Sequence, residues 1–158
     1  MHHIVVAVPL QDALVVRHAA YYEAFPDTPF DKARLDCDED PFTSHFGVYE
    51  SGRIVAAGSL TAQSPSPRSA HAPASRLRGM AVMPERQGGG LGAAVLEYAL
   101  GRVAERGGGL VWANIRVDKA GFYEKWGFVM STDTFVVREG SPLHYYGDLI
   151  VSETGRHP

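Results

Sequence analysis

Cysteine is nearly absent from this sequence: Cys37 is the one cysteine among 158 residues. A single cysteine cannot form an intrachain disulfide, so the sequence excludes a disulfide-stapled secreted domain and favours a reducing compartment. Cys37 lies in the acidic stretch LDCDEDP, whose negative charges disfavour a thiolate. We therefore expect no cysteine nucleophile.

Long apolar runs and an excess of positive charge are also missing. No apolar stretch approaches the roughly 18 residues that a membrane-spanning helix needs, and the net charge at pH 7 is −3. This balance predicts neither a nucleic acid partner nor a membrane partner. The first twelve residues, MHHIVVAVPLQD, have no basic segment before their short apolar run. We therefore expect no signal peptide and a cytoplasmic protein.

Two further kinds of site are absent. The histidines and carboxylates show no spacing typical of metal ligands, so the sequence predicts no metal site. A P-loop is excluded because no Gly-Lys-Ser/Thr follows the glycine-rich stretch. What is present is a chain of ordinary hydrophobic content, long enough for one domain with a sizeable core, which we place at residues 1–158.

The order of periodic segments predicts an α/β fold with helices on both faces of a mixed sheet. We expect strands at 3–8, 45–50, 53–60, 76–83, 110–115 and two or three more within 128–152, and helices at 10–25, 91–106 and 118–126. The first strand should be buried, Val15 and Phe25 should lie on the apolar face of the first helix, and Asp118 should cap the last helix. The loop 63–75, rich in proline and serine, should be exposed and mobile.

Four glycines stand where the strand at 76–83 gives way to the long helix: Gly88, Gly89, Gly90 and Gly92. The first N–H groups of a helix have no partner within it, and the helix dipole favours an anion there. Without side chains, the backbone can approach phosphate oxygens closely. The stretch therefore predicts a phosphate site, more specifically a pyrophosphate site, although a glycine turn chosen only for its geometry is an alternative.

A dinucleotide-binding fold is a second alternative, because Gly88, Gly90 and Ala93 can be written as G-x-G-x-x-A. That fold places its glycines after the first strand and an acidic residue about 20 positions later. Here the glycines follow about the fourth strand, and the next strand ends at Asn114 without a carboxylate.

A third interpretation rests on three segments in order. QGGGLG, from Gln87 to Gly92, matches the pattern Q/R-x-x-G-x-G/A; RGMAVMPE precedes it, and ANIRVDKAGFYEKWGF follows. This combination resembles the GNAT superfamily of N-acetyltransferases. The resemblance is strong over about residues 76–128 and fair over the hairpin at 45–60. The first forty residues match only in their order of strand and helix.

The resemblance implies a fold, a cofactor and a set of binding residues. The fold would be a single GNAT-like domain with a mixed, mostly antiparallel sheet of about six or seven strands, splayed between its central parallel strands. The cofactor would be acetyl-CoA, with its pantetheine arm along the strand and its pyrophosphate at the glycine loop. The implied cofactor-binding residues are Met80, Ala81, Val82, Arg86, Gln87, Gly88, Gly89, Gly90, Leu91, Gly92, Ala93, Asn114 and Phe122.

One position departs from the family pattern. GNAT members often carry Lys or Arg where this chain has Gly89, and Arg86 is the residue that could replace the missing cation. Met80 and Val82 are the residues expected to offer main-chain groups to the cofactor, and an N–H near Val82 would bind the thioester oxygen. Asn114 could bind the pantetheine or cap the segment that follows it.

The resemblance places the tyrosine of FYEKWGF, Tyr123, beside the cofactor sulfur as the catalytic residue. A phenol can protonate a departing thiolate with little tuning. Phe122 and Trp126 are also typical of core aromatics. The general base is open: the candidates are Glu50, His45, His71, His144 and a water relay, and we retain His144 and Glu50 as substrate-side residues.

These residues predict an N-acetyltransferase that moves the acetyl group of acetyl-CoA to a primary amine of a small molecule or peptide by direct attack. Two other functions are possible alternatives: a non-catalytic acyl-CoA-binding or sensor module on the same fold, and a dinucleotide-dependent reductase. The sequence leaves the acceptor amine open. Exposed final strands, within 128–152, could pair with a second copy to form a homodimer.

Overall fold

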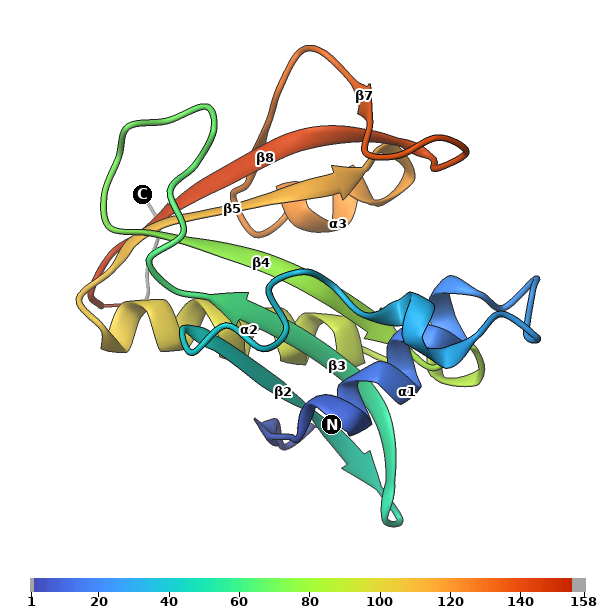
Figure 1. The fold of residues 1–158 in the computed structure, drawn as a ribbon. Coiled ribbons are helices and arrows are strands. Elements are labelled where there is room, and N and C mark those ends of the chain that lie inside the picture. The colour runs from blue at the N-terminus through green and yellow to red at the C-terminus, as the bar shows by residue number, and fades with distance from the viewer. Residues whose placement is uncertain (1, 155–158) are drawn as a thin grey trace. The chain divides into compact units, whose positions relative to one another are not determined.

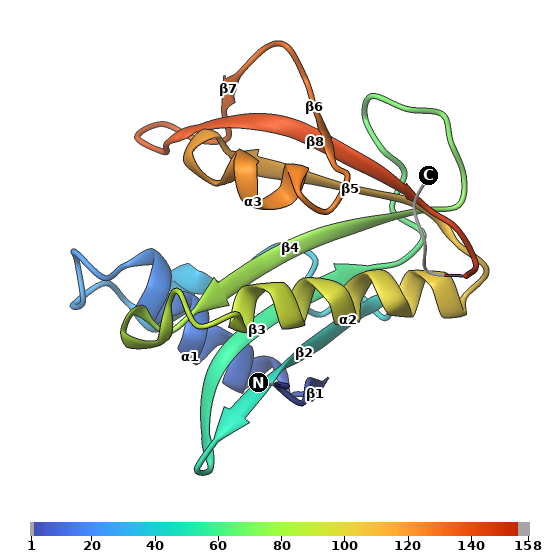
Figure 2. The same ribbon diagram turned by 180° about the vertical axis from the view of Figure 1, so that it is seen from behind.

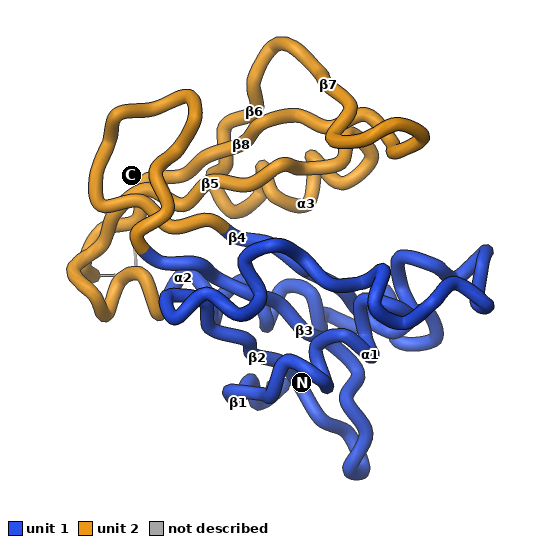
Figure 3. Tube along the Cα trace, viewed as in Figure 1, with its two compact units in different colours: residues 1–62, 77–101 blue, residues 63–76, 102–158 orange. Residues whose placement is uncertain are grey.

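The computed structural model describes residues 2–154 and divides into two compact units (Figure 3). Unit 1 comprises the chain up to Ala62 together with Leu77–Gly101, and unit 2 comprises Gln63–Arg76 and the chain from Arg102 onward. Strand β4 (Ala74–Val82) and helix α2 (Leu91–Glu105) each run from one unit into the other (Figure 3).

Unit 1 is built on an antiparallel hairpin of β2 (Thr43–Glu50) and β3 (Arg53–Thr61), with the short strand β1 (Val6–Ala7) on the outer edge of β2. The predicted turn is confirmed: Ser51 and Gly52 both have positive φ, 51° and 78°. Such a turn matches the right-handed twist of the flanking strands. Helix α1 (Leu10–Tyr21) precedes the hairpin, and the 3-10 helix η1 (Phe30–Ala33) lies between them.

Helices α1 and α2 cover opposite faces of the hairpin in unit 1 (Figures 1 and 2). Neighbouring residues of β3 show this: a Cβ on Gly58 would lie 2.8 Å from Val95 of α2, whereas Ser59 accepts a hydrogen bond from Arg17 of α1. Successive residues of a strand point to opposite faces, so each helix covers its own face. The core of unit 1 includes Leu14, Phe46, Leu60, Val95 and Leu96, each at most 1% exposed.

Unit 2 contains one parallel and three antiparallel strand pairs. The beginning of β4 runs parallel to β5 (Gly109–Arg116). Strand β8 (Leu143–Val151) pairs antiparallel with β5 along the whole length of β5. The two-residue strands β6 (Val129–Met130) and β7 (Phe135–Val136) also pair with β8. Helix α3 (Ala120–Glu124) follows the 3-10 helix η3 (Val117–Lys119).

The predicted fold class is confirmed, since helices accompany strands that are mostly antiparallel. The described residues form eight strands where about six or seven were expected, and β1, β6 and β7 have two residues each. The sequence left the number of strands within 128–152 at two or three, because strands as short as β6 and β7 carry little hydrophobic pattern.

Three local predictions were wrong. The first strand is largely exposed, and Val8 beyond it is its buried neighbour. In α1, the buried face includes Ala13, Val16 and Arg17, whereas Val15 is 37% exposed and Phe25, which lies beyond the helix, is 72% exposed. Asp118 makes no capping hydrogen bond; it accepts two hydrogen bonds from Arg116.

The loop before β4 belongs to unit 2 and most of its residues are exposed, as expected, yet it makes several hydrogen bonds within that unit. The Ser64 carbonyl accepts a hydrogen bond from the Trp112 indole at 2.9 Å, and Ser66 bonds to Tyr146. Arg68 forms two hydrogen bonds with Asp133, at 2.6 and 2.9 Å. Ser66 and Arg68 make these contacts through their side chains, and Ser64 makes its contact through the main chain.

Candidate active site

The glycine loop of unit 1 joins the 3-10 helix η2 (Pro84–Arg86) to α2. Gly88 and Gly90 have φ values of +83° and +84°, a region that other residues rarely adopt, so the turn itself requires these two glycines. A Cβ at either position would have no heavy atom within 4 Å. The loop therefore follows a backbone path that only glycine adopts readily, next to open space.

The first turn of α2 provides N–H groups at the end of that loop. The Ala94 N–H donates to the Gly90 carbonyl, so Leu91, Gly92 and Ala93 belong to the turn whose N–H groups precede the helical ladder. These groups and the helix dipole make the position favourable for an anion.

Strand β4 presents main-chain groups along one edge. Its ladder with β5 covers Ala74, Ser75 and Arg76, and the Met83 N–H donates to Val55 of β3. Because N–H groups alternate between the two edges of a strand, Met80 and Val82 direct theirs away from β3.

Side chains reach the carbonyls of the same two residues. The Tyr21 hydroxyl donates to the Met80 carbonyl and the Gln87 amide donates to the Val82 carbonyl, both at 3.3 Å. The sequence predicted Met80, Val82 and Gln87 as site residues but not Tyr21, which lies far from them in sequence, at the end of α1.

Arg86 and Glu50, predicted as separate site residues, form one ion pair in unit 1. Arg86 Nε and Nη2 donate to the two Glu50 carboxylate oxygens, each at 2.6 Å. These hydrogen bonds and the Arg86 charge lower the pKa of Glu50, which makes its carboxylate a weaker base. His3 Nε2 lies 3.1 Å from the Gly89 carbonyl and must donate that hydrogen bond, so a second basic residue adjoins the loop.

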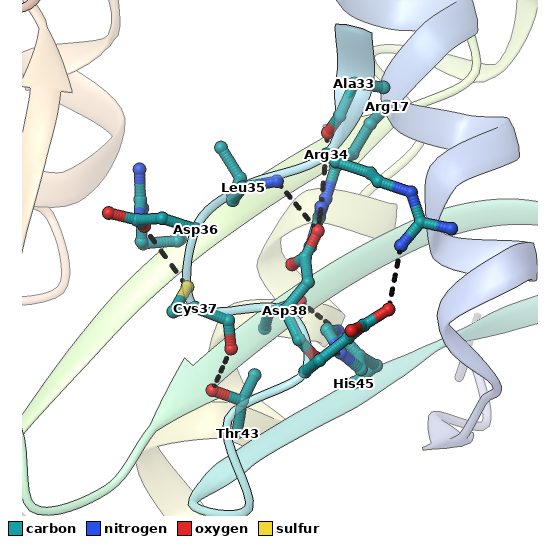
Figure 4. Close-up of polar contacts among 12 residues, drawn as sticks. Arg17, Ala33, Arg34, Leu35, Asp36, Cys37, Asp38, Thr43 and His45 are labelled. Atoms are coloured by element: carbon teal, nitrogen blue, oxygen red, sulfur yellow. Dashed lines mark hydrogen bonds and ion pairs between the residues drawn. The ribbon is translucent and has the colours of Figure 1, made fainter. Parts of the chain in front are cut away.

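A buried polar network in unit 1 joins helix α1 to the segment after η1 and to strands β2 and β3 (Figure 4). Arg17 of α1 is fully buried and donates to Asp38 Oδ2 at 2.8 Å, to Ser59 Oγ at 2.9 Å and to the Ala33 carbonyl at 3.3 Å. His45 Nδ1 lies 2.6 Å from the same Ser59 oxygen. His45 Nε2 faces the Asp38 carbonyl at 3.0 Å, so Nε2 carries the proton in the neutral ring.

Two opposing effects act on Asp38. Burial alone would raise the pKa of this carboxyl, but the hydrogen bonds from Arg17 and from the Leu35 N–H, with the Arg17 charge, hold it below its usual value. The network was missed except for His45, because an arginine in a helix normally indicates a solvent-exposed face. The available signal was its position inside the apolar run ALVVRHAAYY.

Unit 2 carries the predicted catalytic tyrosine. Tyr123 lies in α3, half-buried, with its ring edge-to-face against Phe122 at 5.0 Å and Phe128 at 5.5 Å between centroids. Asn114 is half-buried in β5, opposite Tyr146 of β8. The two aromatic neighbours fix the Tyr123 ring while the side chain stays partly accessible.

His144 also lies in unit 2, near the start of β8. Its Nδ1 is 2.8 Å from the Pro142 carbonyl and must donate that bond, while its ring stacks on Phe135. In the neutral ring, Nε2 is therefore the atom with a free lone pair, as a general base requires.

The comparisons with known proteins identify the family. The acetyltransferase (GNAT) family profile matches residues 10–128, which is most of the chain. The chain belongs to this family. A curated relative, the uncharacterized N-acetyltransferase YitI of Bacillus subtilis, is 28% identical over 121 residues, which cover 77% of this chain and 78% of that protein.

Solved GNAT structures share the fold. The ribosomal-protein-S18-alanine N-acetyltransferase of Escherichia coli has a TM-score of 0.71 at 21% identity, covering 96% of this chain and 95% of its own. An aminoglycoside 6′-N-acetyltransferase complexed with coenzyme A has a TM-score of 0.67 at 13% identity, covering 93% of this chain and 96% of its own. The predicted family and enzyme class are thus confirmed: this GNAT protein is an N-acetyltransferase, and its family uses acetyl-CoA.

Two kinds of feature are absent from the described residues. Within residues 2–154, no group of three or more His, Cys, Asp or Glu side chains is arranged to hold a metal ion. Over the same range, no helix has the length and apolar character needed to cross a membrane.

Proposed function

We propose that this GNAT protein transfers the acetyl group of acetyl-CoA to a primary amine of a small molecule or peptide. The single observation that carries the proposal is the continuity of β4 and the glycine loop in unit 1. Outward-facing main-chain groups of Met80 and Val82 lead directly to the N–H groups of Leu91, Gly92 and Ala93. A pantetheine arm followed by a pyrophosphate requires such groups in this order.

The reaction we propose is a direct displacement. The amine nitrogen bonds to the thioester carbon, and the carbonyl electron pair moves to oxygen, where an outward N–H of β4 stabilises it. The carbonyl then re-forms as the carbon–sulfur bond breaks, the amine nitrogen gives up a proton to a general base, and the thiolate takes a proton from the Tyr123 hydroxyl, which solvent restores. The family match spans residues of both units, so we propose that they act as one catalytic domain.

For the general base, the geometry favours His144 over Glu50. The Nε2 lone pair of His144 is available in the neutral ring, whereas both Glu50 oxygens accept hydrogen bonds from Arg86. Glu50 instead shares the charge of Arg86 beside the glycine loop.

The first test is ligand binding by thermal shift, with acetyl-CoA compared against nicotinamide cofactors. A ligand at 100 times its dissociation constant stabilises the folded state by about 2.7 kcal/mol. Acetyl-CoA should raise the melting temperature and the nicotinamides should not. The reverse result would support a reductase and overturn the proposal. An acetyl-transfer screen over polyamines, amino acids, aminoglycosides and peptide N-termini then identifies the acceptor.

The second test separates an enzyme from a non-catalytic acyl-CoA-binding module. Tyr123→Phe should lower kcat by about 10²- to 10⁴-fold with acetyl-CoA affinity retained. Tyr49→Phe is the matched control. Tyr49 lies in unit 1, where its hydroxyl bonds to Asp12, whereas Tyr123 lies in unit 2. A wild-type protein that binds acetyl-CoA but acetylates none of the screened amines would favour the binding module.

A further inference from the structure

Gly79 interrupts β4 in unit 1 with a backbone conformation of its own. Its φ is +65°, and a Cβ at this position would lie 2.6 Å from Arg17 Nε and 2.8 Å from Arg17 Nη2. Real Cβ atoms do not approach other atoms so closely. The guanidinium of Arg17 therefore occupies the space next to the Gly79 main chain that a side chain would fill.

One nitrogen of the Arg17 guanidinium, Nε, makes no hydrogen bond within the described residues and lies on the side of Gly79. The two Nη atoms donate to Asp38, Ser59 and Ala33, whereas Nε has no hydrogen-bond partner among residues 2–154. Nε is also the atom nearest to the missing Gly79 side chain. A fully buried cation thus lies beside Gly79, the residue before Met80, where solvent does not screen it.

The position of this charge matters because of the next residue. Met80 directs its N–H away from β3, on the edge where the proposed cofactor would lie. Negative charge develops on the thioester oxygen as the amine attacks, and a fixed positive charge behind the N–H donor stabilises it without reorganisation. Asp38 accepts its hydrogen bond from Nη1, whereas Nε, the atom nearest to the missing Gly79 side chain, has no partner among the described residues.

We propose that Arg17 is a positioning residue for acyl transfer: it fixes the Gly79–Met80 segment of β4 and supplies a buried positive charge that polarises the thioester carbonyl through the Met80 N–H. This inference rests on the proposed function, because it assumes that the thioester binds at this edge. It assigns a role in the reaction to a helix α1 residue that has no contact with solvent.

The test measures the bound carbonyl directly and needs no acceptor. Acetyl-CoA labelled with ¹³C at its carbonyl is bound to the full chain, and the C=O stretch is recorded by isotope-edited infrared difference spectroscopy. The main variant is Arg17→Met with Asp38→Asn, which removes both charges together. Breaking only one side of a buried pair would leave an uncompensated charge, and the amide oxygen of the introduced asparagine can still accept from the Leu35 N–H.

Wild type should show a C=O stretch at lower frequency than free acetyl-CoA. The double variant should bind acetyl-CoA within about fivefold of wild type and lose at least half of that frequency shift, since a fixed charge near the oxygen acts strongly in a site without water. Arg34→Met is the matched control. Arg34 is partly exposed and pairs with Asp31 and Glu39, which lie on the same segment of chain as Asp38. Acetyl-CoA bound to this variant should show the same C=O stretch as acetyl-CoA bound to wild type.

Each other outcome is informative. A folded double variant that binds acetyl-CoA with the wild-type stretch overturns the role of Arg17 and leaves the proposed function intact. A wild-type protein that does not bind acetyl-CoA overturns the proposed function and this inference with it. If the double variant does not fold, Arg17→Lys is measured in its place, because lysine keeps the charge but lacks the planar fork. Loss of at least half of the frequency shift would support positioning by the guanidinium, and an unchanged stretch would overturn that positioning role and leave the charge alone as the cause.

Discussion

Arg86 meets the carboxylate of Glu50 through two parallel hydrogen bonds, each 2.6 Å long, at the entrance to the glycine loop. A Cβ on Gly89 would lie 3.4 Å from Arg86 Nη1, so the guanidinium lies close to the position at which many GNAT proteins carry a basic side chain. Arg86 can therefore supply the missing cation, but its charge is shared with Glu50.

We predict that Glu50→Gln strengthens the binding of coenzyme A about threefold, because Arg86 loses its competing anion. Arg86→Met should weaken binding by a similar factor. Isothermal titration calorimetry at low and high salt checks both, and the difference between the variants should shrink as salt screens the charges. Arg53→Met, which breaks the exposed pair with Glu85, is the control. Weaker binding by Glu50→Gln would show that Glu50 acts by orienting Arg86.

Gly79→Ala should destabilise the protein by about 3 kcal/mol or more. The added methyl group meets the buried Arg17 guanidinium, and φ of +65° is strained for alanine. Gly101→Ala is the matched control in helix α2, where a Cβ has no neighbour within 4 Å. That change should stabilise by roughly 0.5–1 kcal/mol, because alanine favours the helix. Urea denaturation measures both, and equal effects would contradict the packing of Arg17 against Gly79.

The contrast between these two glycines shows what the sequence could and could not predict. The hairpin at Ser51-Gly52, the glycine loop and α2 were predictable, because each is encoded by residues adjacent in sequence. The contact of Arg17 with Gly79 joins residues 62 positions apart and leaves no periodic pattern. The same reason applies to the hydrogen bond between Tyr21 and the Met80 carbonyl. It also applies to Arg86 and Glu50, which were each predicted as site residues although their ion pair was not.

The stability contributed by Asp38 should depend on pH. Its pKa in the folded protein lies below the ordinary value of 3.8, so its contribution is complete above that value and is lost as the pH falls through the lower folded pKa. Asp38→Asn should cost about 3–5 kcal/mol at pH 7, because it leaves the Arg17 charge without its partner. The difference in the free energy of unfolding between wild type and Asp38→Asn should stay constant from pH 7 to 5 and narrow near pH 3.

Urea midpoints at these three pH values give that gap, and taking the difference between the two proteins cancels the titration of the other carboxylates. Asp133→Asn serves as the control, since Asp133 also has a lowered pKa but is exposed, so its gap should be small throughout. A gap for Asp38→Asn that does not narrow in acid would contradict the assignment of a charged Asp38 in the network.

The loop 63–73 should resist trypsin because Arg68 is held in unit 2. The Arg68 guanidinium bonds to Asp133 and lies over the rings of Phe135 and Tyr146, at 5.6 and 5.4 Å from their centroids. Tyr146 is itself fixed, since its hydroxyl bonds to Ser66 and donates to Asp148, while burial raises its pKa to about 12. Trypsin must extract the Arg68 side chain before it can cleave the bond that follows.

Asp133→Asn keeps the cleavage site but removes the ion pair, so trypsin should cleave after Arg68 roughly three- to tenfold faster, through more frequent local opening of the loop. Asp118→Asn is the control: it removes a similar exposed ion pair, with Arg116, and should leave this rate unchanged. Mass spectrometry of the fragments identifies the cleaved bond. Equal rates in wild type and Asp133→Asn would show that the Trp112 and Tyr146 hydrogen bonds hold the loop without the ion pair, because cleavage would then depend on breaking those bonds first.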